Sequence, residues 1–413
     1  MFYSKQKIFW FLFSLILIAV TIFCAEAGLR VAAQLSRQAD IFTRRQPTDC
    51  FIHDAKGFFV RGNPDCPDHD ARGYRNHSAL SEAEIVTLGD SWTYGSGVPS
   101  DSAWPHVLSQ RLNRPLYNMG VPGTGPLQSR EILRQALQLH PKVIIFGFYL
   151  GNDLLDDFFF AEKNEKLSEF LTAKDIADVT QAEHAEDLKG KVDVLFNRAM
   201  AANPPQPTEH LSNLGRIRNI LGDNSRLYAF LRSLKKLWFD APPRELAVLD
   251  PRYEDAVAGI LEYQRPYVTP FSEGGWKTVF TSPYRFAVVD LADVRVRAGL
   301  SIAKQTMLAM NQICQDNGIH FIVALLPTKE TIFRRKVHDT SRYELYAGLV
   351  QYEDEIRAQL KALFEEHRVD FVDPLPRLQD ADVQPNFENA DGHPNVAGQE
   401  IIAAAISDFL EQN

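Results

Sequence analysis

Two short segments far apart in the chain carry residues that could together perform nucleophilic catalysis. Ser91 lies in the sequence Gly89-Asp90-Ser91, directly after an apolar run, and Asp391 and His393 lie close to the C-terminus. A serine hydroxyl is a poor nucleophile at neutral pH unless a base takes its proton, and that base needs a partner that fixes its tautomer. The serine, the imidazole and the carboxylate can fill these three roles. Together they predict an acyl-transfer enzyme.

Five short apolar runs predict the strands of a parallel sheet. They are rich in Val, Ile and Phe and are bounded by Gly, Pro, Asn or Asp, as buried parallel strands are. The runs cover residues 84–88, 115–119, 142–150, 320–326 and 369–372. Helix-like segments cover residues 102–112, 128–139, 301–317, 343–367 and 395–410. Strands that alternate with helices are typical of a doubly wound α/β fold with three layers.

Polar motifs follow the predicted strands at the positions where such a sheet binds its ligands. Ser91 follows the first run, a segment ending at Gly123 follows the second, and Asn152 follows the third. Asp391 and His393 lie in the loop before the last predicted helix. Ligands of open parallel sheets bind at the carboxyl ends of the strands. We therefore expect these residues to meet at one edge of the sheet.

The residues just named resemble those of the SGNH hydrolases, which are also called GDSL-type esterases. The resemblance covers residues 85–153 and 301–413. It implies that Ser91 is the nucleophile, that His393 is the base and that Asp391 is the acid orienting it. It also implies a flavodoxin-like sheet and an activity on ester bonds.

The same resemblance implies an oxyanion hole. Its donors would be the backbone N–H groups of Ser91 and Gly123 and the side-chain amide of Asn152. Such donors stabilise the negative charge of a tetrahedral intermediate. Glycine suits position 123 because a backbone without a Cβ can approach a ligand closely.

One departure from the family pattern concerns the spacing of the acid and the base. Many members have two residues between them, whereas Gly392 alone separates Asp391 from His393. A compact Asp-x-His is similar to the branch of alginate O-acetyltransferases, as is the segment Leu326 to Lys329. Lys329 has two interpretations: a cation that contacts an anionic polysaccharide or a leaving group, or an ordinary solvated lysine.

The composition excludes several other classes of protein. A formal charge of −9 and a pI near 5.7 do not fit a nucleic-acid partner, which requires clustered Lys and Arg. No Cys and His cluster has the spacing of zinc ligands, so we expect no metal. The chain has neither a phosphate-binding nor a dinucleotide-binding glycine motif, so we expect no organic cofactor. Thr93 stands where a G-x-S-x-G nucleophile elbow would require glycine.

The N-terminus carries an uncharged apolar run from Ile8 to Cys24. Extended to Ala27, it reaches about 30 Å as a helix, which is the thickness of a hydrocarbon core. Ala25-Glu26-Ala27 also has the form of a signal-peptide cleavage site. We favour an uncleaved transmembrane helix over a signal peptide because the run is long. Either interpretation predicts an exported catalytic domain, in the periplasm or outside the cell.

The four cysteines give a weaker indication of compartment. Cys50 and Cys66 flank a loop-rich stretch and could form a disulfide in an oxidising compartment, or remain as two thiols. Cys24 and Cys314 are expected to be unpaired.

These patterns divide the chain into five predicted segments. They are a membrane anchor with a juxtamembrane helix (1–37), a stalk and entry segment (38–80), the first half of the catalytic domain (81–153), a mostly helical insertion (154–299), and the second half of the catalytic domain (300–413). The insertion contains a proline cluster, Pro204–Pro207, and many aromatic residues, which could pack in a core or form a platform for a sugar.

The predicted function is a membrane-anchored serine ester hydrolase that acts through an acyl-enzyme and deacetylates a glycan or another exported ester. Two alternatives remain open. An O-acyltransferase would share the first half-reaction and pass the acyl group to a sugar hydroxyl of an exopolysaccharide. A catalytically silent, anchored binding or assembly module would keep the fold without the chemistry.

Overall fold

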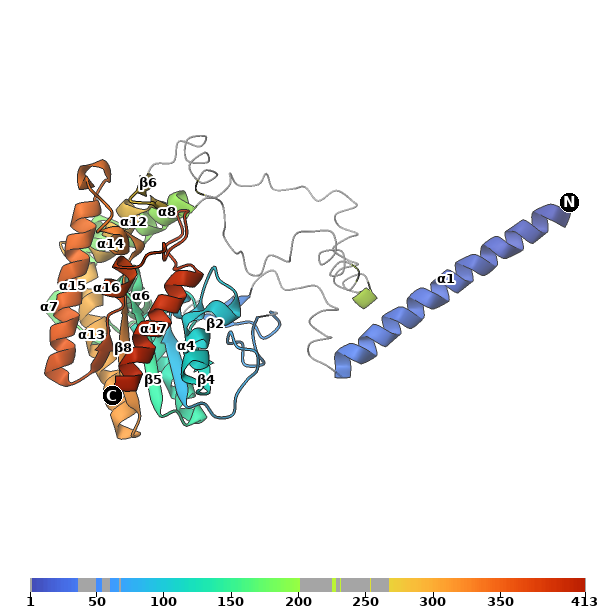
Figure 1. The fold of residues 1–413 in the computed structure, drawn as a ribbon, viewed down its shortest axis with the longest axis horizontal. Helices are drawn as coiled ribbons and strands as arrows, with labels where there is room; N and C mark the ends of the chain where they lie inside the picture. The colour runs from blue at the N-terminus through green and yellow to red at the C-terminus, as the bar shows by residue number, and fades with distance from the viewer. Residues whose placement is uncertain are drawn as a thin grey trace. The chain divides into compact units, whose positions relative to one another are not determined.

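The computed structural model describes residues 2–35, 50–53, 60–66, 68–200, 225–227, 231, 253 and 267–412 (Figure 1). These residues belong to two compact units. One contains the N-terminal helix and residues 225–227, and the other contains the central sheet with its helices.

The central sheet has five parallel strands in the described part of the chain, in the order β4-β3-β5-β8-β9. The strands are β3 (Ile85–Gly89), β4 (Leu116–Asn118), β5 (Val143–Tyr149), β8 (His320–Leu326) and β9 (Asp370–Val372). Four of the five predicted apolar runs contain a whole strand, and the first run contains β3 except for its last residue, Gly89. This order is the flavodoxin-like one, with its switch point between β3 and β5. The prediction of a doubly wound parallel α/β fold is confirmed.

Five long helices flank this sheet: α4 (Trp104–Leu112), α5 (Pro126–Ala136), α13 (Val294–Asp316), α15 (Tyr346–His367) and α17 (Val396–Gln412). Each corresponds to a predicted helix. Helix α13 begins at Val294 rather than at residue 301, because the Asp293 side chain caps it by accepting a hydrogen bond from the Arg295 N–H.

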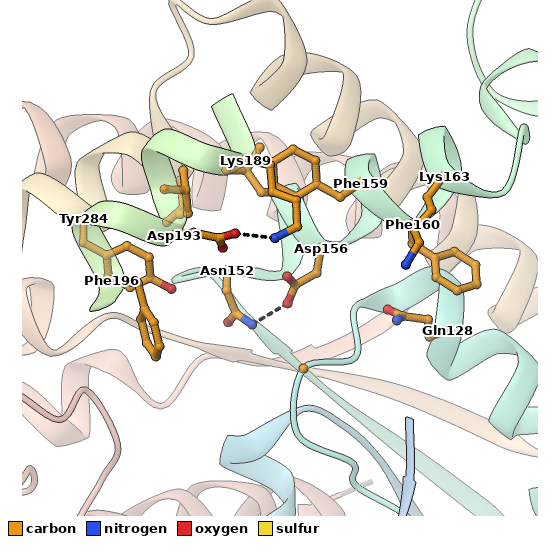
Figure 2. Close-up of a pocket in the computed structure, with 14 residues that line it drawn as sticks. Gln128, Asn152, Asp156, Phe159, Phe160, Lys163, Lys189, Asp193, Phe196 and Tyr284 are labelled. Atoms are coloured by element: carbon orange, nitrogen blue, oxygen red, sulfur yellow. Dashed lines mark hydrogen bonds and ion pairs between the residues drawn. The ribbon is translucent and has the colours of Figure 1, made fainter. Parts of the chain in front are cut away.

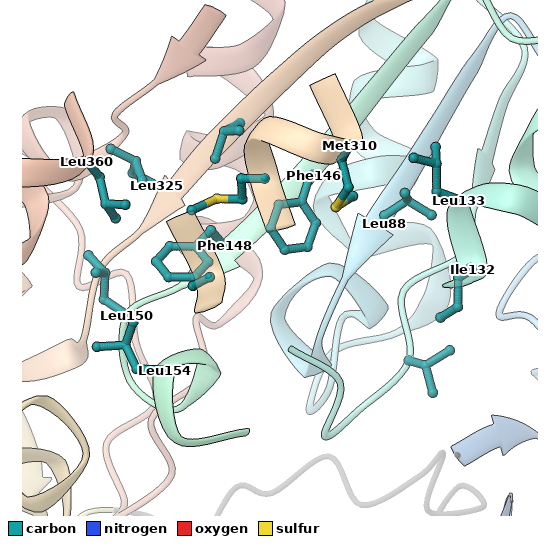
Figure 3. Close-up of a cluster of buried hydrophobic side chains, with 14 of the residues drawn as sticks. Leu88, Ile132, Leu133, Phe146, Phe148, Leu150, Leu154, Met310, Leu325 and Leu360 are labelled. Atoms are coloured by element: carbon teal, nitrogen blue, oxygen red, sulfur yellow. The ribbon is translucent and has the colours of Figure 1, made fainter. Parts of the chain in front are cut away.

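Alternate residues of β5 point to opposite faces of the sheet and build two cores. Phe146 and Phe148 pack in one core together with Met310 of α13, which Figure 3 shows. Ile145 and Tyr149 belong to the other core, which includes residues of α4 and α17. A strand buried on both faces has no polar side, and this explains the continuous apolar run in the sequence.

The segment between β5 and helix α13 corresponds to the predicted insertion (154–299). Its described elements are α6 (Asp153–Lys163), α7 (Ala173–Ala185), α8 (Leu188–Met200), the strands β6 (Thr269–Glu273) and β7 (Trp276–Phe280), and α12 (Ser282–Val289). Pro204–Pro207 and Tyr263 lie outside the described residues. The β6–β7 hairpin was not predicted, although the two-residue loop Gly274-Gly275, with both φ angles positive, is typical of a tight hairpin turn.

The shorter elements complete the description. Two strands, β1 (Phe51–His53) and β2 (Val60–Gly62), pair antiparallel. The short helices are α3 (Ser91–Tyr94), α14 (Lys329–Phe333) and α16 (Leu375–Gln379), with single turns of 3-10 helix at 100–102, 137–139, 167–169 and 340–342.

The N-terminal unit contains helix α1 (Phe2–Leu35), which covers the predicted anchor. Its Glu26 carboxylate accepts hydrogen bonds from the Ser225 hydroxyl and from the backbone N–H groups of residues 226 and 227. Among the residues that the structure describes, no helix combines the length and the apolar character needed to cross a membrane. The prediction of a transmembrane helix is therefore not supported.

The two cysteines left open by the sequence are bonded. Cys50 and Cys66 form a disulfide with their Cα atoms 5.6 Å apart. Cys24 is exposed and Cys314 is buried, and both are free thiols, as predicted.

Candidate active site

Ser91 lies at a sharp turn from strand β3 into helix α3. Gly89 ends the strand with φ at +141°, and a Cβ there would come within 2.6 Å of the Gly147 carbonyl oxygen on β5. The Asp90 carboxylate caps α3 by accepting a 2.9 Å hydrogen bond from the Trp92 N–H. Strand, glycine and cap together place the Ser91 hydroxyl at the carboxyl edge of the sheet.

The structure brings Ser91, His393 and Asp391 into one hydrogen-bonded chain. Nε2 of His393 lies 2.8 Å from Oγ of Ser91, and Nδ1 lies 2.6 Å from Oδ1 of Asp391. The same carboxylate oxygen accepts the His393 backbone N–H at 2.7 Å. Oδ2 of Asp90 is a second, longer partner of the serine hydroxyl, at 3.2 Å. With Nδ1–H donated to Asp391, Nε2 is the nitrogen that faces the serine.

The acid and the base stabilise each other's charged forms. Burial alone would raise the pKa of Asp391, but the charge and the hydrogen bonds of His393 hold it well below its usual range. Burial would lower the pKa of His393, but the Asp391 carboxylate raises it above 6.5. An imidazolium ion at this position is therefore favoured by its surroundings, as a general base requires.

Lys329 holds the histidine loop, the segment Asn389–His393 that carries Asp391 and His393, through hydrogen bonds to its backbone. It is fully buried, and its ammonium group donates 2.8 Å hydrogen bonds to the backbone carbonyls of Val279, Asn389 and Asp391. Burial lowers its pKa to about 8. Both sequence interpretations of Lys329 are wrong, because the side chain is neither solvated nor free to reach a substrate. Its three acceptors lie far away in the sequence, so no local pattern could have revealed this role.

Arg285 explains why glycine separates the acid from the base. A Cβ on Gly392 would lie 2.3 Å from Nη2 of Arg285. The guanidinium is itself buried and donates a 2.9 Å hydrogen bond to the carbonyl of Gly151. Arg285 thus packs against both the histidine loop and the turn before Asn152. Sequence reasoning missed it, since a single arginine inside an insertion carries no signal.

The two other predicted oxyanion donors are Gly123, in the loop between β4 and α5, and Asn152, in the loop between β5 and α6. Gly123 has φ at +74°, which disfavours other residues, and a Cβ there would meet nothing within 4 Å. Asn152 precedes helix α6, and its amide Nδ2 donates a 2.6 Å hydrogen bond to Oδ2 of Asp156. The Asn152 Oδ1 atom is buried and has no hydrogen-bond partner in the described part of the chain.

Asp156 is a site residue that the sequence did not reveal. Burial raises its pKa to about 7, and the hydrogen bond from Asn152 opposes that rise. The only local signal is its spacing, four residues after Asn152 and therefore one helical turn away. The hydrogen bond to Asp156 fixes the orientation of the Asn152 amide.

A pocket of about 320 Å³ opens beside Gly123 and Asn152. Figure 2 shows Asn152 and Asp156 in the middle of the view, with the rings of Phe196, Phe159 and Phe160 around them. Its full lining is Gly123, Gln128, Asn152, Leu155, Asp156, Phe159, Phe160, Lys163, Lys189, Val192, Asp193, Phe196, Tyr284 and Val288. Helices α6, α8 and α12 supply most of these residues. Within the described ranges, no group of three or more His, Cys, Asp and Glu is placed to hold a metal ion.

The comparison with protein families adds an independent observation. Residues 87–224 match the model of the GDSL-like lipase/acylhydrolase family. The matched range includes Ser91, Gly123 and Asn152, and the geometry adds His393 and Asp391 to it. The match and the site geometry together support the resemblance to the SGNH hydrolase superfamily. Nothing tests the narrower likeness to alginate O-acetyltransferases.

Solved structures similar to this chain come from several bacteria. They include a lipolytic protein of the G-D-S-L family from Desulfitobacterium hafniense DCB-2, with 13% identity, a TM-score of 0.36, and 79% of this chain and 99% of that chain covered. A GDSL-like lipase from Bacteroides thetaiotaomicron VPI-5482 has 10% identity, a TM-score of 0.33, and coverages of 79% and 87%. A protein described as an acylhydrolase from Bacteroides fragilis NCTC 9343 has 10% identity, a TM-score of 0.32, and coverages of 81% and 89%.

These TM-scores are too low to add weight, so the assignment depends on the family match and on the site. No curated protein matches the chain.

Proposed function

We propose that this protein is a serine ester hydrolase that acts through an acyl-enzyme. The observation that carries the proposal is the continuous hydrogen-bonded chain from Ser91 Oγ through His393 to Asp391. A binding module has no use for such a chain, whereas ester cleavage requires it. The family match supports chemistry on acyl groups in general, and hydrolysis is the specific proposal.

In the first half-reaction, Ser91 Oγ attacks the ester carbonyl carbon while His393 Nε2 takes the hydroxyl proton. The carbonyl oxygen becomes an oxyanion, which the N–H groups of Ser91 and Gly123 and the Asn152 amide would bind. The intermediate then expels the alcohol, which receives the proton from His393. In the second half-reaction, water attacks the acyl-serine, His393 takes the water proton, and the acid leaves as Ser91 recovers its hydrogen.

A chromogenic ester and a fluorophosphonate probe test this proposal. The wild type should release nitrophenol from p-nitrophenyl butyrate and be labelled by the probe, whereas Ser91→Ala should do neither. Ser109→Ala is a matched control, because that hydroxyl bonds only the Arg114 carbonyl in the described structure and lies outside the site. A wild type that neither turns over nor labels would support the silent binding module instead.

The acceptor distinguishes hydrolysis from acyl transfer. The same assay with oligosaccharides present should still yield the free acid as its main product. If the acyl group appeared mainly on a sugar hydroxyl, the O-acyltransferase alternative would replace hydrolysis. Both share the first half-reaction, so product analysis rather than nitrophenol release is the decisive measurement.

The disulfide supports a separate proposal, that the domain works in an oxidising compartment outside the cytoplasm. Disulfides persist in such compartments and are rare where thiols are kept reduced. Protein recovered from its natural host under alkylating conditions should carry two reactive thiols when denatured, from Cys24 and Cys314, and four after reduction. Four reactive thiols before reduction would contradict the proposal.

A further inference from the structure

The pocket beside the oxyanion residues receives only one part of an ester. Gly123 and Asn152 line it, whereas Ser91 and His393 do not. The leaving alcohol must take its proton from His393 Nε2, so the alcohol has to lie beside that ring. The substituent on the other side of the carbonyl carbon is the acyl chain. The pocket is therefore on the acyl side of the site.

The lining of the pocket fits an apolar chain better than a sugar. Lys189 pairs with Asp193 at 2.6 Å and Asn152 with Asp156 at 2.6 Å, while Oε1 of Gln128 accepts a backbone N–H at 2.9 Å. Each of these five side chains already has a hydrogen-bond or ion-pair partner within the protein, although Oδ1 of Asn152 is left without one in the described residues. A sugar, which carries several hydroxyl groups, would have to break these pairs to gain most of its hydrogen bonds.

Apolar side chains supply the walls that remain for a ligand. They are Leu155, Phe159, Phe160, Val192, Phe196 and Val288. Phe196 is 41% exposed although its ring packs on Tyr284 at a centroid distance of 5.3 Å. A large aromatic side chain left partly in water at the margin of a pocket gains burial when an apolar ligand covers it.

The volume of the pocket limits the length of the acyl chain that it can hold. A water-sized group occupies about 30 Å³, and a methylene is of similar size, so a pocket of about 320 Å³ holds several methylenes. An acetyl group would place one methyl group there and leave most of the space empty. We propose that this pocket binds a saturated acyl chain of about six to ten carbons, so that medium-chain acyl esters are the substrate class. This inference depends on the proposed ester hydrolase function.

A series of p-nitrophenyl esters from acetate to palmitate tests the inference. Each methylene buried contributes up to about a fourfold gain in kcat/KM. We expect kcat/KM to rise at least tenfold from acetate to octanoate and to fall again at palmitate, which exceeds the pocket. A wild type that prefers acetate would overturn the inference and leave ester hydrolysis intact. No turnover of any ester would overturn the proposed function and the inference with it.

Two variants of helix α8 locate the specificity in the pocket. Val192→Trp fills the pocket and should lower the ratio of octanoate to acetate turnover at least tenfold. Val194→Trp is the matched control, because this residue is 46% exposed and does not line the pocket. Its ratio should equal that of the wild type. The ratio does not depend on the folded fraction of either variant, so an unchanged ratio in Val192→Trp would overturn the inference.

Discussion

The ammonium group of Lys329 lies 2.8 Å from the carbonyl oxygen of Asp391, the residue whose side chain orients His393. Its other two hydrogen bonds reach the carbonyls of Asn389, in the same loop, and of Val279, in strand β7. A single buried cation therefore joins helix α14, the hairpin of the insertion and the histidine loop. The position of the base thus depends on elements that lie outside the loop of Asp391 and His393.

Replacing Lys329 with Met should slow catalysis without weakening substrate binding. Methionine has a similar volume but no N–H group, so three buried carbonyls lose their donor and the loop loosens. A displacement of about 1 Å at the reacting groups costs up to about 10² in rate. We expect kcat to fall by 10- to 100-fold with KM changed by less than threefold, as measured by steady-state kinetics. A selective rise in KM would show that Lys329 acts on the substrate.

The alkaline side of the wild-type pH profile should depend on the ionisation of Lys329 and on its hydrogen bonds to the three carbonyls. The pKa of Lys329 is lowered to about 8, and the neutral amine that forms above this pH has two N–H groups for three carbonyls. Activity should therefore decline as the pH rises through about 8. Comparing kcat/KM from pH 6 to 10 in the wild type and in Lys329→Met checks this. An equal alkaline decline in both proteins would assign it to another group.

The acidic side of the profile should depend on Asp391. His393 must be neutral to accept the serine proton, and Asp391 raises its pKa above 6.5, so wild-type activity should increase with pH through a midpoint above 6.5. In Asp391→Asn the negative charge is lost, the pKa of His393 falls, and the midpoint should move to lower pH. The kcat should also fall, by about 10⁴-fold as for the corresponding carboxylate of serine proteases. A midpoint unchanged by the substitution would contradict the pairing.

The predicted site residues Ser91, Asn152, Asp391 and His393 share a local signal in the sequence. Ser91 and Asn152 directly follow strands, and the strands could be recognised because β3 and β5 are buried on both faces and therefore apolar throughout. Asp391 and His393 are only two residues apart, so their pairing needs no knowledge of the fold. The parallel strands place Ser91 and Asn152 at one edge of the sheet, and the hydrogen bond between His393 and Ser91 places the loop of Asp391 and His393 there too.

The supporting residues could not be predicted, because their roles depend on long-range contacts. Lys329 bonds carbonyls that are 50, 60 and 62 residues away, and Arg285 bonds one that is 134 residues away. Asp156 acts through the orientation of a neighbouring amide, which a sequence does not contain. Sequence patterns report burial and turns, whereas these three residues are defined by which backbone segments meet around them.

Gly392→Ala should damage the site through Arg285. A Cβ would come within 2.3 Å of Nη2, so the buried guanidinium, which bonds the Gly151 carbonyl through Nη1, would have to shift. We expect kcat/KM to fall by 10- to 100-fold. In the double variant Gly392→Ala/Arg285→Lys the clashing Nη2 atom is absent. Its loss of activity should therefore be smaller than the sum of the losses, in free energy, of the two single variants. Additive losses would exclude the steric link.

The hydrogen bond from Asn152 to Asp156 predicts a pair of losses that do not add. Removing an oxyanion donor costs about 10² to 10³ in kcat, so Asn152→Ala should lose that much. Asp156→Ala leaves the amide free to rotate and should lose about 10-fold to 100-fold, with KM little changed. Because Asp156 acts only through the amide, the double variant should be no slower than Asn152→Ala alone. A double variant that lost the product of both factors would show that Asp156 acts on the reaction independently of Asn152, and the measured coupling energy separates the two cases directly.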